Sequence, residues 1–274
     1  MTEFVAMIIY KQGDCVHIQN LGDVSWKKKV KIIENDVEPD LIYPLLRGLD
    51  VKRWYAKPSV LTVLPNEKGG KTISVSKMKT TYPKTYNFLY QFFGDLKNRK
   101  GEPYTSKLKP WNELPFQQAQ RIAMPFYCIF NAHKSWARYK VVWKHVSGKI
   151  SGKAEFNAAV VSTFNIKGVG SKFVIPDHGL MGVPCRSENE AYYVAAILNS
   201  FVIREIVKGY SLETHITTDV LKYIHISPFN PYNAMHEKLS QKSKEAHEAA
   251  ELEDQTKQEK VEAEIDKIVK ELYK

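Results

Sequence analysis

The chain has 274 residues, of which 43% are hydrophobic, 12% aromatic and 26% charged. This many aromatic residues can form a buried core, so a chain that is disordered throughout is excluded. The sequence contains no run of about 18 apolar residues, so we predict no membrane-spanning helix. The N-terminus has an acidic third residue and no small-residue cleavage site, so we expect no signal peptide. Three well-separated cysteines argue against a disulfide framework or a zinc site and predict a cytoplasmic protein.

The net charge is +10, and it is unevenly distributed. Residues 231–274 carry 8 basic and 11 acidic side chains, whereas residues 1–230 carry 32 basic and 19 acidic ones, a net charge of +13. A globular body with this excess favours a polyanionic partner, such as a nucleic acid, although solubility alone would also explain it.

The first third of the chain is predicted to be rich in strands. Short apolar or alternating runs predict strands at residues 4–10, 15–18, 26–33 and 59–64. Residues 37–54 are expected to form a helical turn and a loop, because Pro44 and Gly48 interrupt them.

A helix is predicted from Pro83 to about Arg99, because proline suits a first helical turn and aromatic residues follow at helical spacing. The polar, proline-containing stretch 100–115 is expected to be a loop. Further strands are expected at residues 125–131, 137–144, 158–164 and 172–175.

The clearest helix is predicted at residues 188–208. Ser187 and Glu190 form a capping box at its start, and Gly209 suits its end. A strand-like segment is expected at residues 225–228, followed by one long helix, or two with a break, from Asn233 to the end.

In this last segment Val261, Ile265, Ile268 and Leu272 form an apolar seam, which we expect to pack within the molecule rather than in a dimeric coiled coil. The fold is therefore predicted to be mixed α+β: a strand-rich domain over residues 1–230 with packed helices, and a helical extension over residues 231–274.

Two groups of basic residues are candidates for contacts with DNA. On a strand over residues 137–145, Arg138, Lys140 and Lys144 would share one face, with side chains at alternate positions about 6.5–7 Å apart, close to the spacing of phosphates. The second group surrounds Trp54, which we expect to be a core residue, as is Trp143. The candidate DNA-binding residues are Arg47, Lys52, Arg53, Arg138, Lys140, Lys144, Lys149, Lys153 and Lys172.

Catalytic motifs are scarce. The sequence has no phosphate-binding loop, CxxC, HExxH or GxSxG motif, and Gly168-Val169-Gly170 is expected to be a turn. The spacing of Asp40, Asp50 and Lys52 fits a magnesium-dependent nuclease, in which two carboxylates hold the metal and lysine orients the water. This nuclease and a protein-assembly module are the alternatives to DNA recognition.

Several strings, in this order, resemble one family. They are NLGDVSWKKKVKI, VEPDLIYPLLRGLDVKRW, YKVVWKHVSGKI, VIPDHGLMGVP, ENEAYYVAAILNSFVIR and THITTDVLKYIHIS, followed by Asn-x-x-His and a further histidine. The set covers almost the whole chain and resembles the C-terminal target-recognition region of N6-adenine DNA methyltransferases. The resemblance is to single-chain type II restriction–modification enzymes and related phage-defence enzymes with a TaqI-like specificity domain.

The resemblance implies a chain that holds double-stranded DNA and reads base edges, with Asn199 bonded to a neighbouring loop. The family's catalytic domain carries a Gly-rich loop and an Asn-Pro-Pro-Tyr motif. This sequence has neither, and Asn230-Pro231-Tyr232 lacks the second proline. We therefore expect no catalytic residue, metal or cofactor in this chain. S-adenosylmethionine and methyl transfer would belong to a catalytic domain in the same or a partner chain.

Overall fold

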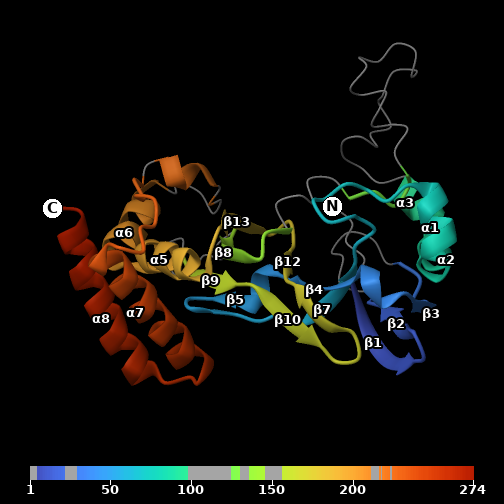
Figure 1. Ribbon diagram of the computed structural model, residues 1–274, viewed down its shortest axis with the longest axis horizontal. Helices are drawn as coiled ribbons and strands as arrows, with labels where there is room; N and C mark the ends of the chain where they lie inside the picture. Colours follow the sequence, from blue (N-terminus) through green and yellow to red (C-terminus); the bar gives the residue numbers. More distant parts are fainter. Residues whose placement is uncertain are drawn as a thin grey trace, which may run out of the picture. The chain divides into compact units, whose positions relative to one another are not determined.

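The computed structural model describes residues 5–21, 30–97, 125–129, 136–145, 156–210, 216, 218–222 and 224–274. They form a mixed α+β fold, which confirms the predicted class (Figure 1). The chain divides into two compact units. Unit 1 comprises Met1–Pro44, Val60–Trp136 and Asn165–Lys172, and unit 2 comprises Leu45–Ser59, Ala137–Phe164 and Phe173–Lys274. This division differs from the expected boundary after residue 230, because residues 231–274 belong to unit 2.

The sheet of unit 1 is built around a tight hairpin. Its strands are β1 (Val5–Gln12), β2 (Cys15–Asn20), β3 (Glu34–Val37), β7 (Val60–Val63) and the first part of β4 (Ile42–Leu46). They lie in the order β4-β7-β1-β2-β3. Gly13 turns the hairpin with φ 57°, a left-handed conformation that glycine adopts without strain. Val16 and Ile18 face inward from β2 and are fully buried.

Two predictions in this part of the chain, one of a strand and one of a loop, are corrected. Residues 30–33 form no strand, and 26–29 lie outside the described residues; pairing with β2 begins instead at Glu34. Residues 37–54, expected to form a helical turn and a loop, contain the strand β4 between two short 3-10 turns, η1 (Pro39–Leu41) and η2 (Gly48–Asp50). All five residues of β4 are buried, so the sequence shows no alternation to reveal the strand.

The described part of unit 1 also includes three short helices: α1 (Val75–Thr81), α2 (Pro83–Tyr90) and α3 (Phe93–Lys97). The predicted helix at 83–99 is thus two helices, α2 and α3. The helix α1 was not predicted, because it has only seven residues and buries only Met78. The predicted strand at 125–131 is wrong where it is described, since residues 125–129 form a turn.

Unit 2 contains a three-stranded antiparallel sheet in the order β13-β8-β9. Its strands are β8 (Tyr139–Lys144), β9 (Ala158–Val161) and β13 (Leu180–Cys185). Shorter strands of unit 2 are β5 (Val51–Lys52), β6 (Tyr55–Ala56) and β12 (Ile175–Pro176). The strands β10 (Thr163–Ile166) and β11 (Gly170–Phe173) belong to both units, since Asn165–Lys172 is part of unit 1. The strands β5 and β6 form one hairpin, β10 and β11 form another, and β12 pairs in parallel with Leu45 and Leu46.

The central strand of the three-stranded sheet, β8, is buried on both faces. Val141 and Trp143 of β8 face a helical core that includes Leu198 and Ile265. The intervening Val142 faces a second core that includes Leu46 and Val174. A strand between two apolar layers has no solvent face in its central part.

The predicted helix at 188–208 is interrupted. It consists of α5 (Glu188–Asn199) and α6 (Phe201–Tyr210), with Ser200 in an extended conformation between them. Ser187 caps α5 as predicted, its side chain accepting a hydrogen bond from the Glu190 amide. Asn199 exchanges two hydrogen bonds with the backbone of Ala158, at 2.9 and 2.8 Å, and so binds the start of β9 rather than a loop.

The C-terminal segment forms two helices that lie side by side, α7 (Ala234–Glu251) and α8 (Gln255–Leu272) (Figure 1). The chain reverses at Glu253, which has φ 55°. Before them, residues 218–222 form the 3-10 turn η5 (Thr218–Lys222), and the expected strand at 225–228 is absent.

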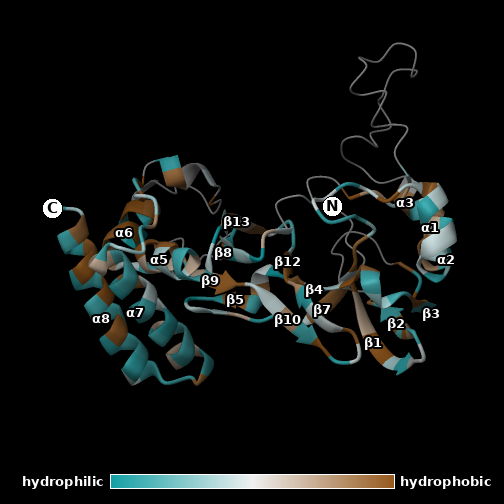
Figure 2. Cartoon of the chain, viewed as in Figure 1, coloured by the Kyte–Doolittle hydropathy of each residue, from teal (hydrophilic) through white to brown (hydrophobic). Residues whose placement is uncertain are grey.

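The predicted seam of α8 packs within the molecule. Val261, Ile265 and Ile268 are buried in the helical core of unit 2, and Leu272 packs against it. Figure 2 shows hydrophobic stretches interspersed with hydrophilic ones along α8. This confirms the intramolecular interpretation. No helix in the described ranges is long and apolar enough to cross a membrane.

Candidate nucleic-acid interface

The two units differ in charge. Unit 1 carries 19 basic and 11 acidic residues, a net charge of +8, whereas unit 2 carries 21 basic and 19 acidic residues. Within unit 2, segments 45–59 and 137–164 together hold nine basic and two acidic residues. The remaining segment, 173–274, holds 12 basic and 17 acidic residues. Positive charge in unit 2 is thus concentrated on the segments that contain β5, β6, β8 and β9.

Arg138, Lys140 and Lys144 were predicted to share one solvent-facing side of β8, but the middle residue does not face solvent. Arg138 is exposed and its guanidinium lies 5.3 Å from the centre of the Tyr139 ring, and Lys144 is half-buried at the end of the strand. Lys140 is only 2% exposed, and its ammonium donates a hydrogen bond to the carbonyl of Ala137. The expectation of three solvent-facing side chains is therefore wrong for Lys140, because the second apolar core covers that face of the strand.

The buried ammonium of Lys140 has a measurable consequence. Burial lowers the pKa of Lys140 from 10.5 to about 8, because the charged form is poorly solvated there. We expect Lys140→Met to raise the free energy of unfolding at pH 7 by roughly 1–3 kcal/mol, since the charge no longer has to be buried. The gain should disappear above the unfolded-state pKa of about 10.4, where lysine is neutral in both states. Urea unfolding at pH 7 and above pH 10 measures both values, and a less stable variant at pH 7 would contradict the prediction.

Arg47 belongs to a structural network in unit 2. Its guanidinium donates to the Ser59 hydroxyl at 2.8 Å, and the Arg47 amide donates to the Asp50 carboxylate at 2.8 Å. The other carboxylate oxygen of Asp50 accepts from Ser59 at 2.6 Å. Arg47 therefore helps to stabilise the turn η2. The sequence predicted Arg47 as a DNA contact and did not indicate this structural role.

Arg53 and Trp54, at the turn of the β5–β6 hairpin, are held by α8. The Glu262 carboxylate accepts from the Trp54 indole at 2.7 Å and pairs with the Arg53 guanidinium at 2.9 Å. Trp54 is 1% exposed, as expected for a core residue, although its φ of 62° is unusual for a bulky side chain. Lys52 is the exposed basic residue of this hairpin.

The remaining candidates are Lys172, Lys149 and Lys153. Lys172 donates to the carbonyl of Asp40 at 3.2 Å and lies 5.2 Å from the centre of the Tyr43 ring. Partial burial lowers the pKa of Lys172. Lys149 and Lys153 lie outside the described residues.

The nuclease alternative receives no support from Asp50. That carboxylate is 8% exposed, and both of its oxygens already accept hydrogen bonds from Arg47 or Ser59. Among the residues that the structure describes, no three histidine, cysteine or acidic side chains gather where they could hold a metal ion.

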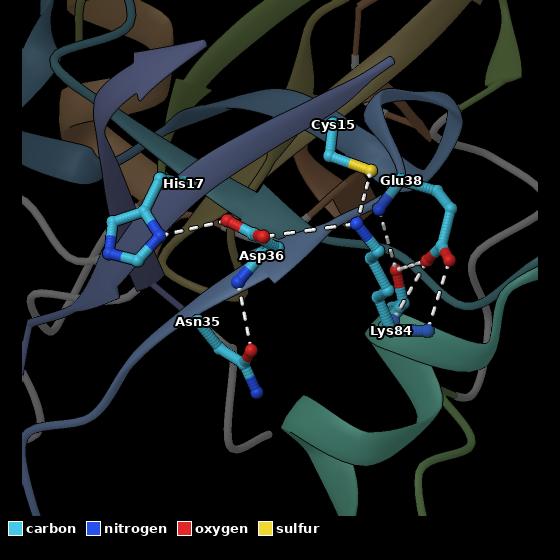
Figure 3. Close-up of polar contacts among 7 residues, drawn as sticks. Cys15, His17, Asn35, Asp36, Glu38 and Lys84 are labelled. Atoms are coloured by element: carbon cyan, nitrogen blue, oxygen red, sulfur yellow. Dashed lines mark hydrogen bonds and ion pairs between the residues drawn. The ribbon is translucent and has the colours of Figure 1, made fainter. Parts of the chain in front are cut away.

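A polar cluster in unit 1 was not predicted from the sequence (Figure 3). The His17 imidazole bonds the Asp36 carboxylate at 2.9 Å, and the Lys84 ammonium lies 3.8 Å from the same carboxylate and 3.0 Å from the Cys15 thiol. The hydrogen bond with Cys15 raises the pKa of Lys84. The residues of each interacting pair are 19 to 69 positions apart in sequence, so no local pattern signals the cluster.

The same cluster anchors α2. Glu38 accepts hydrogen bonds from the amides of Lys84 at 3.0 Å and Thr85 at 2.8 Å, and also from the Thr85 hydroxyl. A carboxylate at a helix N-terminus satisfies free amides and interacts favourably with the helix dipole. Glu38 therefore fixes the start of α2 against the strands.

Of the nine predicted DNA contacts, Lys52 and Arg138 are exposed and Lys144 is half-buried. The side chains of Arg47, Lys140, Arg53 and Lys172 have intramolecular partners. This arrangement can contact phosphates. In comparisons with known proteins, no family model and no curated protein matches this chain.

Proposed function

We propose that this chain recognises double-stranded DNA in a sequence-specific manner, as the target-recognition part of an N6-adenine DNA methyltransferase of a restriction–modification or phage-defence system. Methyl transfer would take place in a catalytic domain of the same or a partner chain. The ordered sequence strings described above support the methyltransferase part of this proposal.

The observation that carries the proposal is the separation of charge within unit 2. The strand-bearing segments hold nine basic and two acidic residues, and the segment with α5 to α8 has an acidic excess. DNA phosphates are attracted to the first and repelled by the second. In this proposal Arg138, Lys144 and Lys52 contact the backbone, and other residues read the bases.

The double variant Arg138→Ala/Lys144→Ala tests the docking surface. Each neutralised phosphate contributes about −0.9 to the slope of log K against log salt concentration, so we expect the slope to become shallower by about 2. Binding should weaken alike for every duplex. Fluorescence anisotropy with a labelled duplex over a salt series measures the slope.

A matched control removes two lysines from the acidic segment. Lys257 and Lys267 are exposed on α8, and the double variant Lys257→Ala/Lys267→Ala changes the net charge by the same amount. Its slope should equal that of the unmodified chain. Equal slopes for both double variants would show that the ends of β8 do not contact phosphate. Selection from a random duplex pool tests sequence preference, and an unenriched pool would count against specific recognition.

A further inference from the structure

The turn η2 of unit 2 presents one apolar side chain to solvent. Leu49, its middle residue, is 69% exposed, and it belongs to neither of the two apolar cores that enclose β8. Single exposed leucines are common on protein surfaces, and this one is set apart by how firmly it is held and by the charge around it.

The backbone that carries Leu49 is held on two sides. The Asp50 carboxylate accepts a hydrogen bond from the Arg47 amide at 2.8 Å, and the Asp50 amide donates to the Arg47 carbonyl at 2.9 Å. On the other side, a Cβ atom added at Gly48 would lie 4.0 Å from the carbonyl oxygen of Gly179, so the turn rests beside the start of β13. Leu49 is therefore displayed in a preorganised position and loses little freedom when it meets a ligand.

Basic side chains flank this turn within unit 2. The Gly179 carbonyl also accepts a hydrogen bond from the His145 amide at 2.8 Å, so η2 lies at the end of β8 that carries Lys144. Lys52 follows η2 on β5 and is exposed. Leu49 is thus close to two of the three residues that the proposed function assigns to phosphates.

The chemistry of leucine limits what it can recognise on a duplex. Its side chain has no hydrogen-bond donor or acceptor, so it can neither bond a phosphate nor read a hydrogen-bonding pattern. On the base-pair edges in the major groove, the apolar group is the thymine methyl. Covering that methyl with leucine removes apolar surface of both groups from water, which stabilises the complex only where a thymine is present.

We infer that Leu49 contacts the methyl group of a thymine in the major groove of the recognised duplex. This inference rests on the proposed function and names one of the residues that read the bases, a role that phosphate contacts cannot fill. Lys52 and Lys144 hold the duplex at this end of β8, and η2 places the leucine at a base edge.

The test uses the full chain and the duplex obtained by selection from a random pool. Each thymine of that duplex is replaced in turn by uracil, which lacks only the methyl group. At one position, affinity measured by fluorescence anisotropy should fall about 4-fold, the effect of losing one buried methyl-sized group.

The variant Leu49→Ala should bind the thymine duplex about 4- to 10-fold more weakly, because it no longer covers the methyl group. It should also bind the thymine and uracil duplexes equally well. The slope of log K against log salt concentration should not change, since leucine carries no charge. The melting temperature of the variant should stay unchanged too, because an exposed side chain contributes little to stability.

Two further variants serve as controls. Leu49→Met keeps an apolar side chain of similar reach and should still distinguish thymine from uracil. Leu252→Ala removes another leucine of unit 2, which is 75% exposed between α7 and α8, and should bind both duplexes like the unmodified chain.

The inference is overturned, and the proposed function kept, if Leu49→Ala distinguishes thymine from uracil as well as the unmodified chain does. A selected duplex without thymine has the same consequence. An unmodified chain that binds no duplex would overturn the inference and the proposed function together.

Discussion

Replacing Ile265 with alanine should lower the free energy of unfolding by about 2–5 kcal/mol. Ile265 is 1% exposed and lies in the helical core of unit 2 with Val261, Ile268 and Leu198. The substitution removes buried methyl groups and leaves a cavity that the neighbouring helices cannot fill completely. Urea denaturation monitored by circular dichroism measures the change.

The control for this prediction is another aliphatic residue of the same segment. Leu252 lies between α7 and α8 and is 75% exposed, so Leu252→Ala should alter stability by less than about 0.5 kcal/mol. If Ile265→Ala is no more destabilising than Leu252→Ala, the seam of α8 does not pack on unit 2. The seam would then be available to a partner helix, as the assembly-module alternative requires.

The helices of unit 2 could be predicted because their signals are local. The capping box at Ser187 spans only four residues, and the apolar positions of α8 follow one another every three or four residues. Both appear in the structure as expected. The interruption at Ser200 has a distant cause. The Phe201 amide at the start of α6 donates to the Asp266 carboxylate of α8 at 2.7 Å, a contact between residues 65 positions apart.

Strands buried on both faces were harder to predict. In β4 the run of buried residues lacks alternation, and Pro44 indicated a loop. In β8 the alternation of lysine and apolar residues indicated a solvent face, but the fold places Lys140 under a second core. Alternation of polar and apolar residues indicates which side chains share a face of a strand. Only the tertiary structure determines whether both faces are buried.

The side-chain contacts of the candidate DNA-binding residues were harder to predict than the helices, because their partners are distant in sequence. Arg53 is expected from sequence to be free for a phosphate or a guanine, yet its partner Glu262 lies on the last helix. Trp54 bonds the same carboxylate from the neighbouring position. The residue types in this hairpin gave the correct core assignment for Trp54, because burial follows from side-chain chemistry. They could not reveal the ion pair, because no local spacing encodes it.

His247 on α7 connects the helices to β9 and to two aromatic rings. Its Nε2 accepts a hydrogen bond from the Val160 amide at 3.0 Å, so Nδ1 carries the proton and donates to the Ser243 carbonyl at 2.7 Å. The rings of Trp54 and Tyr192 meet the imidazole edge to face at 5.4 and 5.0 Å. Protonation of Nε2 would break the bond to Val160 and place two donors against each other.

Stability should therefore depend on pH through His247. Burial lowers its pKa from 6.5 to about 4. Between these values the unfolded chain binds a proton that the folded chain does not, so stability falls as the pH drops from about 6.5 to 4. The loss from this group should reach at most about 3 kcal/mol below pH 4, and no effect remains above pH 7, where histidine is neutral in both states.

His247→Gln isolates this contribution, because glutamine offers a donor and an acceptor but does not titrate in this range. The variant should be less stable than the unmodified chain at pH 7, and the difference should shrink or reverse by pH 4. Urea unfolding at several pH values between 7 and 4 follows both curves. His225→Gln, at an exposed position, serves as the control and should keep the pH dependence of the unmodified chain. Parallel curves for His247→Gln and the unmodified chain would mean that the imidazole accepts a proton without disturbing its bond to Val160.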